Sequence, residues 1–402
     1  MSASENGTGD GAVAAAGGRP PPTPDPAQRG WQTFGHAAAV RLLGRSLELG
    51  RLSHSYLFTG PRGVGKMSLA LDLARAVNCR PAPDLFGDGL AGDYPTAPCG
   101  RCTQCDRISR GLHSDIRVIA VGGEIDGAGA GSERESGGRT RIRIGQIRQL
   151  QHEAALKPFE GVRRVFVIDG AEQMNLDAAN CLLKTLEEPP DQVLLILLAE
   201  ASDALLETIV SRCQHIGLRP VPFAVLESAL IERYGASPDT AATLSRRARG
   251  APGIAISMQS DPTSGDRHDQ ALLRILGVLT GNLEERLRYA RELSAQFRRE
   301  RDAVYAELDL WSDWWRDALL TQSGLDDATA NPEWSQSLKG AASALGPSGV
   351  TVAAEAVDSA RAALRANASP RLALEVFVLD LPSAPASIMP GNQAPAAARL
   401  EQ

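Results

Sequence analysis

Short apolar runs alternate with segments of helical spacing between residues 36 and 218. Four runs have the length and composition of buried strands: 55–59, 116–120, 164–169 and 193–199. The last two are almost continuously apolar, as expected of parallel strands that helices cover on both faces. Helical spacing is present in three stretches: 36–50, 66–78 and 175–187. Strands that alternate with helices predict an α/β domain built on a parallel sheet flanked by helices.

The strand pattern fades after about residue 218, and two helical regions follow. Both ends of the chain are rich in Gly, Ala and Pro and hold too few large apolar side chains to offset the entropy of ordering the chain. The Gly-rich stretch 122–138 is expected to be a flexible insertion. The predicted organisation is a disordered tail at 1–30, an α/β domain at 31–218, a small helical domain at 219–262, a longer all-helical domain at 266–380 and a disordered tail at 381–402.

Composition narrows the function classes. The chain has 402 residues, 43% of them hydrophobic, which suits two or three domains with cores of their own. It has no run of eighteen apolar residues and no secretory leader pattern, so we expect a cytoplasmic protein without membrane contact. A net charge of −6 argues against a dedicated polyanion binder, although a local basic face could still exist. Only four of the 42 basic residues are lysines, which draws attention to Lys66.

The segment that ends at Lys66 reads GPRGVGK (60–66) and fits the phosphate-binding pattern G-x-x-x-x-G-K. Glycines let backbone N–H groups wrap round phosphate oxygens, and the helix that follows directs its N-terminus at the same anion. Its place between a predicted strand and a predicted helix favours ATP or ADP binding over an incidental Gly-rich turn. The candidate nucleotide-binding residues are Gly60, Arg62, Gly63, Val64, Gly65, Lys66, Met67, Ser68, Asp169 and Glu172.

Two positions depart from a hydrolytic site of this type. Met67 stands where Ser or Thr would bind Mg²⁺, and a thioether is a poor ligand for a hard cation. Ser68 comes next but points about 100° away around the helix. Asp169 closes a buried strand, either as the acidic Mg²⁺ ligand of such sites or as a strand-end cap. Gly170 holds the place of a water-orienting glutamate, and Glu172 lies two residues on. We therefore expect ATP binding with weak or absent hydrolysis by this chain.

Four cysteines follow with the spacing C-x19-C-x2-C-x2-C: Cys79, Cys99, Cys102 and Cys105. Closely spaced pairs can turn their thiolates toward one centre, and four thiolates suit a closed tetrahedral Zn²⁺ site. An iron–sulfur cluster and free thiols are the alternatives, whereas disulfides are not expected in a reducing compartment. Cys181 and Cys213 lie among apolar residues and are expected to be packing residues.

These motifs form an ordered set: HSYLFTGPRGVGK (54–66), the cysteine knuckle (79–105), RIGQIRQL (143–150), VFVIDGAEQMN (165–175), LLKTLEEPP (182–190) and IVSRCQHIGL (209–218). The set resembles the AAA+ subunits of the bacterial clamp loader of DNA polymerase III. The knuckle, and LLKTLEEPP followed by SRC, are its most specific features. The resemblance is strong over 31–260 and weaker over LDLWSDWWRDALL (308–320). It implies an AAA+ domain at 31–218, a helical lid domain at 219–262 and a helical collar domain, used in oligomerisation, at 266–380.

The resemblance also implies partners. Clamp-loader subunits, including gamma/tau and delta, form a pentameric ring that opens the sliding clamp and places it on primed DNA at replication forks on the nucleoid. In that ring Arg212 of the SRC motif would act in trans, as an arginine finger that stabilises charge on the γ-phosphate in a neighbour's ATP site. The alternative is that Arg212 caps the preceding helix. For Lys184 a contact with DNA phosphate and a salt bridge to Glu187 or Glu188 are both open.

Two kinds of subunit within this family differ at three positions. A gamma/tau-type motor subunit has Lys-Thr in the phosphate loop, Asp-Glu at the second acidic element and a nucleotide-sensing arginine in the lid. This chain has Met67, Gly170 and Gly253 at those places. At all three positions the chain resembles the delta-prime subunit, which supplies an arginine finger to a neighbour and need not hydrolyse ATP itself. A motor ATPase, and a scaffold whose phosphate loop binds nothing, are the alternatives.

Overall fold

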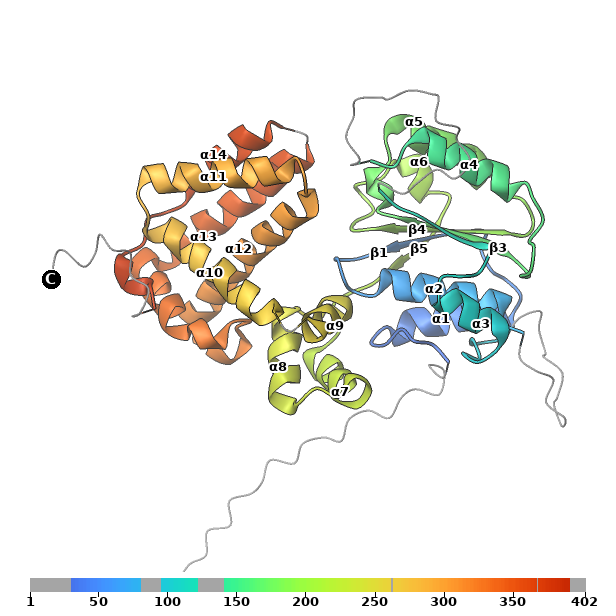
Figure 1. Ribbon diagram of the computed structural model, residues 1–402, viewed down its shortest axis with the longest axis horizontal. Coiled ribbons are helices and arrows are strands. Elements are labelled where there is room, and N and C mark those ends of the chain that lie inside the picture. The colour runs from blue at the N-terminus through green and yellow to red at the C-terminus, as the bar shows by residue number, and fades with distance from the viewer. Residues whose placement is uncertain (1–29, 81–94, 122–140, 262, 367, 391–402) are drawn as a thin grey trace, which may run out of the picture.

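The computed structural model describes residues 30–80, 95–121, 141–261, 263–366 and 368–390. An α/β region and a helical region lie side by side, joined by three short helices (Figure 1). The tail predicted at 1–30, apart from Gly30, and the insertion predicted at 122–138 lie outside the described residues. Among the described helices none is long and apolar enough to cross a membrane.

A five-stranded parallel sheet forms the centre of the α/β region. Its strands are β1 (Ser55–Thr59), β2 (Ile116–Ile119), β3 (Arg164–Asp169), β4 (Val193–Ala199) and β5 (Gln214–Gly217), in the spatial order β2-β3-β4-β1-β5. Every pairing is parallel, so all five carboxyl ends meet at one edge of the sheet. The four predicted strands are present. Strand β5 was not predicted, because only Ile216 of its four residues is buried and it has no apolar run.

Helices cover both faces of the sheet (Figure 1). One face carries α1 (Ala37–Glu48), α2 (Lys66–Asn78) and α3 (Thr103–Ser109), and the other carries α4 (Ile144–Ala154), α5 (Leu176–Glu187) and α6 (Glu207–Val210). Side chains alternate between the faces: Tyr56 and Phe58 pack on the α1–α2 side, and Leu57 packs on the α4–α5 side. A short 3₁₀ turn, η2 (Ala171–Gln173), follows β3. The predicted α/β fold class is confirmed.

Three helices then form a small unit with its own core. They are α7 (Phe223–Tyr234), α8 (Pro238–Arg247) and α9 (Pro252–Ser260), called the lid helices below. Leu226, Leu230 and Leu244 pack together in this core. Phe34, from the segment before α1, packs in the same cluster. The chain ahead of the sheet is therefore anchored to the lid helices.

The remaining chain is helical, as predicted. It contains α10 (Ser264–Thr280), α11 (Leu283–Phe297), α12 (Arg301–Gln322), α13 (Ser335–Arg365) and α14 (Pro370–Asp380), with the 3₁₀ turns η3 (Asp326–Ala328), η4 (Pro332–Trp334) and η5 (Ala386–Ile388). The segment 308–320 lies in α12, where Trp311, Trp314 and Trp315 are fully buried. Helix α13 is interrupted at Gly346, whose φ of 64° is left-handed, just before Pro347.

The tail predicted to be disordered from residue 381 is ordered as far as residue 390, so that prediction is wrong for this stretch. Leu381 and Ile388 are almost completely buried in the core of the C-terminal helices. The backbone N–H of Ala384 donates to the Leu279 carbonyl at 2.9 Å. Arg286 also donates to the Leu381 and Pro382 carbonyls at 2.6 and 3.0 Å, so apolar anchors and hydrogen bonds together dock a segment whose composition predicts disorder. The residues 391–402 lie outside the described part of the chain.

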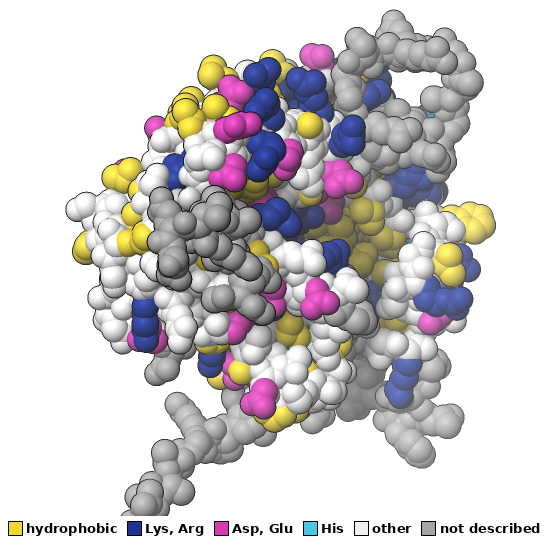
Figure 2. Space-filling view, turned by 60° about the vertical axis from the view of Figure 1, so that its left-hand side comes forward, with side chains coloured by type: hydrophobic (Ala, Val, Ile, Leu, Met, Phe, Trp, Pro, Cys, Tyr) yellow, Lys and Arg dark blue, Asp and Glu magenta, His cyan; other side chains and the backbone are white. Residues whose placement is uncertain are grey.

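Ion pairs link the regions. Arg62 in the loop after β1 pairs with Asp302 of α12 at 3.4 Å, and Arg365 of α13 pairs with Glu200 after β4 at 2.7 Å. Arg249, between α8 and α9, pairs with Asp313 of α12. On the face shown in Figure 2, basic and acidic side chains lie beside one another over much of the surface. The C-terminal helices therefore contact both the sheet region and the lid helices through charged groups.

Candidate functional site

A cavity of about 550 Å³ opens at the carboxyl edge of the sheet. Its walls come from the loop after β1, the ends of β3 and β4, the segment before α1, helix α9 and the start of α12. All the predicted nucleotide-binding residues except Gly60 line it: Arg62, Gly63, Val64, Gly65, Lys66, Met67, Ser68, Asp169 and Glu172. The parallel sheet brings the residues of the loop after β1 close to Asp169 and Glu172, because β1 and β3 end at the same edge of the sheet.

The phosphate loop (60–66) has the backbone that its glycines predict. Gly60, Gly63 and Gly65 have φ values of 148°, 73° and 111°, a region that other residues rarely adopt. A Cβ on Gly63 would also lie 2.6 Å from Ile254 Cγ1 in α9, which is too close. Gly65 is the N-cap of α2, so the helix begins directly at Lys66 and presents its N-terminus to the cavity. This geometry suits an anion.

Lys66 is folded back on its own loop. Its Nζ donates to the Gly60 carbonyl at 2.5 Å and to the Pro61 carbonyl at 3.1 Å. Burial lowers the pKa of Lys66, and the nearby carboxylates of Glu200, Glu172 and Asp169 oppose that change. A phosphate entering the loop would replace two carbonyls as partners of this ammonium group.

The position after the lysine offers no metal ligand. Met67 is half-buried, lines the cavity and packs against the core on the α1–α2 side of the sheet. Ser68 also lines the cavity but is exposed, on the next position round the helix. The first turn of α2 therefore places a thioether where a hydroxyl would bind Mg²⁺.

Three carboxylates face the loop from the ends of β3 and β4. Asp169 is exposed at the end of β3, and Glu172 is half-buried in η2. Burial raises the pKa of Glu172, and the Glu200 carboxylate raises it further. Glu172 Oε2 is buried without a hydrogen-bond partner among the described residues. This wall could hold a cation beside a phosphate, through Asp169 and Glu172.

Gly170 interrupts the acidic wall for a steric reason. Its φ of 73° is left-handed, and a Cβ there would lie 3.3 Å from the Gln173 side chain. A glutamate at this position would be strained in the present backbone. Position 170 therefore offers no side chain that could orient a water molecule beside Asp169.

The lid contacts the phosphate loop through backbone. The Gly253 N–H donates to the Gly63 carbonyl at 2.8 Å. A Cβ at Gly253 would lie 3.1 Å from that carbonyl oxygen, so a side chain would need the loop to shift. An arginine that senses nucleotide could not occupy this position without that shift.

Arg212 lies at the opposite edge of the sheet from the phosphate loop. It lies two residues before the start of β5, and its carbonyl accepts from Ser55 Oγ, at the first residue of β1, at 2.7 Å. The loop begins five residues later, about 16 Å along the strand. Arg212 does not line the cavity. Its side chain is 37% exposed, with Nη2 2.8 Å from Glu187 Oε1.

Arg212 also makes the local contact that the alternative interpretation requires. Its Nη1 donates to the Thr208 carbonyl in α6 at 3.0 Å. Both contacts lie on the surface, so neither removes the guanidinium from reach of another molecule. Glu187, which could have paired with Lys184, is the partner of Arg212.

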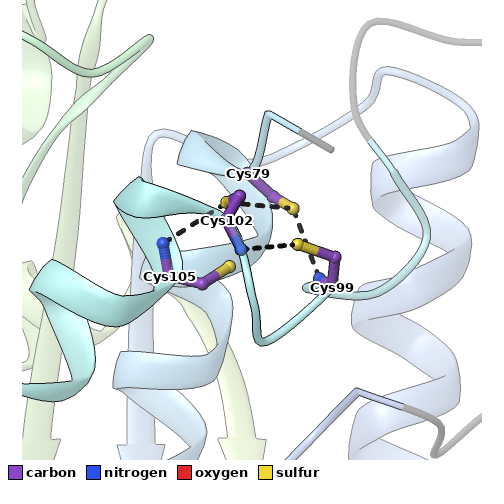
Figure 3. Close-up of side chains that lie close together, drawn as sticks. All are labelled: Cys79, Cys99, Cys102 and Cys105. Carbon is purple, nitrogen blue, oxygen red and sulfur yellow. Dashed lines mark hydrogen bonds between the residues drawn. The ribbon is translucent and has the colours of Figure 1, made fainter. Parts of the chain in front are cut away.

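The four cysteines of the knuckle converge (Figure 3). Their sulfur atoms all lie within 4.8 Å of one another, and Cys79 Sγ is 4.0 Å from Cys102 Sγ. Tetrahedral Zn–S bonds of about 2.3 Å place sulfur atoms about 3.8 Å apart, so the arrangement fits a four-thiolate metal site. Cys79 follows α2, while Cys102 and Cys105 belong to the start of α3. The fold thus brings Cys79, at the end of α2, together with the cysteines at the start of α3.

The backbone of the knuckle supports thiolates. The N–H groups of Cys99, Cys102 and Cys105 donate to the sulfurs of Cys79, Cys99 and Cys102 at 3.3, 3.3 and 3.5 Å. A hydrogen bond from the Cys79 thiol lowers the pKa of Cys105 to about 5. Cys181 and Cys213 lie apart from this cluster and pack on the α4–α5 side of the sheet, where burial raises the pKa of Cys213 to about 11.

Sequence reasoning missed several cavity residues. Glu200, Asp302 and the segment 32–34 line the cavity, and none of them belongs to a recognised motif. Glu200 directly follows the β4 run, and the carboxyl end of a central parallel strand was a signal that could have found it. Asp302 and the segment 32–34 reach the cavity only through tertiary packing.

Comparison with known proteins gives concordant matches. A sequence model described as "DNA polymerase III, delta subunit" matches residues 35–222. The chain is 30% identical over 342 residues to DNA polymerase III subunit delta' of Bacillus subtilis, covering 85% of this chain and 94% of that protein. It is 33% identical over 260 residues to DNA polymerase III subunit tau of Escherichia coli K12, covering 62% of this chain but 36% of that protein.

A solved structure is also similar. The gamma subunit-related protein of DNA polymerase III from Thermotoga maritima aligns over 84% of this chain and 97% of that one, with 18% identity and a TM-score of 0.39. At that score the fold assignment rests on the sheet order and helix arrangement described above.

Proposed function

This chain belongs to the delta-prime family of DNA polymerase III clamp-loader AAA+ proteins, as its motifs predicted, and we propose that it works in trans, by supplying Arg212 to the ATP site of a neighbouring subunit. The match to the Bacillus subtilis delta' subunit covers 85% of this chain, whereas the match to tau covers 62% of it. A delta-prime role therefore accounts for more of the chain than a motor role does.

The position of Arg212 carries the proposal. The residue lies at the amino edge of the sheet, about 16 Å along β1 from the loop that binds phosphate, so it cannot reach its own site. Its guanidinium is on the surface, and both side chains of its ion pair with Glu187 are exposed to solvent. Exposed pairs of this kind contribute about 0–1 kcal/mol, so a γ-phosphate on a neighbour could replace the carboxylate at little cost.

The chain's own cavity is proposed to bind ATP or ADP without being the site of rapid turnover. The phosphate loop and Lys66 supply the anion contacts, and Asp169 and Glu172 could hold a Mg²⁺ ion. Met67 supplies no ligand to that ion, and Gly170 supplies no base. These two positions support a subunit that binds nucleotide and hydrolyses it slowly or not at all.

The metal of the cysteine knuckle is proposed to be zinc. Four sulfurs within 4.8 Å and three N–H···S hydrogen bonds fit a closed structural site with no open position for chemistry. Its contribution would be to join the end of α2 to α3.

The partners and the domain roles follow from the family. We expect gamma/tau and delta subunits as neighbours in a pentameric loader. The assembly would act on the sliding clamp and primed DNA, in the cytoplasm at the replication fork. The proposed domains are an AAA+ domain at 31–218, a lid at 219–262 and a collar from 266 to about 388, where the last buried anchor lies.

A turnover experiment separates the delta-prime proposal from its alternatives. Purified chain, with and without the other loader subunits, is assayed for binding of labelled ATP and for its hydrolysis, with Lys66→Ala as the control for binding. Binding without turnover by the chain alone supports the proposal. Rapid turnover by the chain alone would identify a motor ATPase, and no binding at all would leave a scaffold.

A further inference from the structure

We propose that Asp72 is a positioning residue for the nucleoside end of the cavity, and that the cysteine knuckle holds Asp72 in place through Arg75. The inference deepens the proposed function, since it presupposes a nucleotide in this cavity. It assigns the knuckle a task inside this chain: to fix one wall of the nucleotide site.

Asp72 is a fully buried carboxylate in the middle of α2. Its Oδ1 accepts from the Gln32 N–H at 3.2 Å, and its Oδ2 accepts from both the Thr33 N–H and the Thr33 hydroxyl at 2.7 Å. All three donors belong to the segment ahead of α1, some forty residues away in the sequence. A buried charge is retained only where such partners satisfy it, so the segment 32–33 is fixed in position by this carboxylate.

Arg75 connects Asp72 to the knuckle. One turn further along α2, its Nη2 pairs with Asp72 Oδ1, and both side chains are buried. Its Nη1 donates to Ser109 Oγ, at the end of α3, at 3.1 Å. Cys102 is the N-cap of α3 and Cys105 lies in its first turn, so a metal held by these cysteines would fix the helix that carries Ser109. A continuous chain of polar contacts thus runs from Ser109, at the end of α3, to the segment 32–33, and helix α3 itself joins Ser109 to the knuckle.

That segment forms the end of the cavity suited to a nucleoside. The phosphate loop occupies one side, and the acidic residues at the ends of β3 and β4 occupy another. Apart from Asp302 of α12, the remaining lining is apolar or neutral, and it includes Gln32, Thr33, Phe34, Tyr234, Pro252 and Ile256. A base and sugar need an apolar surface with a few polar groups, and this is the part of the cavity that offers it.

Among the described residues, the side-chain hydrogen bonds that hold this segment from the sheet side come from Asp72. Phe34 packs with the lid helices, and Arg233 of α7 lies over its ring at 5.4 Å. Trp31 packs in the core on the α1–α2 side. Between these apolar contacts, Asp72 holds the Gln32 and Thr33 amides, and Arg233 Nη1 also donates to the Gln32 carbonyl at 3.4 Å. Loosening Asp72 should therefore widen the nucleoside end and leave the phosphate loop unchanged.

The test uses the full zinc-loaded chain and a variant remote from the cavity. Ser109→Ala removes the contact between α3 and Arg75, and Ser109 does not line the cavity. We expect ATP affinity, measured by titration calorimetry, to fall about fivefold, the effect of one lost hydrogen bond. Affinity for inorganic tripolyphosphate, which lacks a nucleoside, should not change. Hydrogen exchange of the Gln32 and Thr33 amides should become faster.

Thr33→Val completes a double-mutant cycle, because it removes the hydroxyl that Asp72 accepts from. The two substitutions should be non-additive for ATP affinity, since both act through one carboxylate. Ser46→Ala, which removes an exposed serine hydroxyl bonded within α1, is the matched control and should change neither ligand's affinity.

The outcomes are separable. If ATP affinity and amide exchange are both unchanged in Ser109→Ala, the inference about Asp72 is wrong, but the proposed nucleotide site is unaffected. An equal loss for ATP and tripolyphosphate also overturns it, because that result indicates a general loosening of the domain. If the unaltered chain binds neither ligand, the proposed nucleotide site is wrong and the inference fails with it.

Discussion

Arg212 Nη2 lies 2.8 Å from Glu187 Oε1, in an ion pair that joins the connection before β5 to the end of α5. The two side chains are 37% and 49% exposed, so water screens the pair and it contributes little to stability. Glu187 belongs to the LLKTLEEPP segment and Arg212 to the SRC segment, which the fold brings together on one surface. In this pair the guanidinium of Arg212 is oriented so that another anion can replace the Glu187 carboxylate as its partner.

Replacing Arg212 with Ala should leave this chain folded and able to assemble, because the lost contacts are on the surface. ATP hydrolysis by the reconstituted loader should fall by about a factor of 10³, the lower end of the effect of an arginine finger. The measurement is steady-state phosphate release by the full complex, with assembly checked by size-exclusion chromatography. Unchanged turnover in an intact complex would show that Arg212 is not a finger.

Glu187→Gln is the control for that experiment. It breaks the ion pair but keeps the guanidinium, so turnover should change by less than about fivefold. A loss as large as that of Arg212→Ala would mean that the ion pair itself, rather than the free guanidinium, is required.

Met67→Thr should place a hydroxyl where a Mg²⁺ ligand is expected, at the first turn of α2. We expect the affinity for ATP to rise in the presence of Mg²⁺, by about fivefold, and to stay the same in EDTA. Turnover by the chain alone should remain at the wild-type level, because Gly170 provides no base. Met67→Leu, which has a similar volume and no hydroxyl, is the matched control. Turnover at a motor-like rate in Met67→Thr would contradict the assignment of a non-motor subunit.

The knuckle should hold about one zinc per chain, as measured by metal analysis of the purified protein. Cys105→Ala should abolish that metal, and the thermal midpoint should fall by at least about 5 °C, since binding of a structural metal stabilises the folded state. Cys181→Ala is the control, because Cys181 is half-buried and lies outside the cluster. Iron with visible absorbance would indicate a cluster, and four reactive thiols without metal would reject the site.

Asp313 should make the stability of the C-terminal helices depend on pH. Burial raises the pKa of Asp313 from 3.8 to about 6, against the opposing effect of Arg249. A carboxyl with a raised pKa binds its proton more tightly in the folded state, so its contribution is greatest below about pH 4 and is lost as pH rises through 6. The change over that range should be at most about 3 kcal/mol.

Asp313→Asn provides the measurement. Urea unfolding followed by tryptophan fluorescence reports mainly on this part of the chain, which holds four of the five tryptophans: Trp311, Trp314, Trp315 and Trp334. The difference in unfolding free energy between wild type and Asp313→Asn should decrease from pH 4 to pH 7. A difference that is constant with pH would mean that Asp313 does not titrate in this range.

Much of the fold could be predicted, because the interior of a parallel sheet leaves a strong local pattern. The strand 193–199 is apolar along its whole length, the strands 55–59 and 164–169 are apolar between polar end residues, and the structure has the same bounds. The edge strand β5 and the segment 381–390 could not be predicted. In both, a few buried residues such as Ile216 and Ile388 determine the structure, and their partners are distant in the sequence.

The sequence by itself determined which chemistry this chain can offer. The Gly-rich loop that ends in Lys66, the methionine after it and the cysteine pattern C-x19-C-x2-C-x2-C can all be recognised in the sequence, because each is defined by residue type and spacing. Tertiary structure alone decided where each group lies. Arg212 is remote from Lys66 because the two residues lie near opposite ends of parallel strands, and hence at opposite edges of the sheet. Asp72 accepts hydrogen bonds from Thr33 because a buried carboxylate needs donors, and the fold supplies them from a segment distant in the sequence.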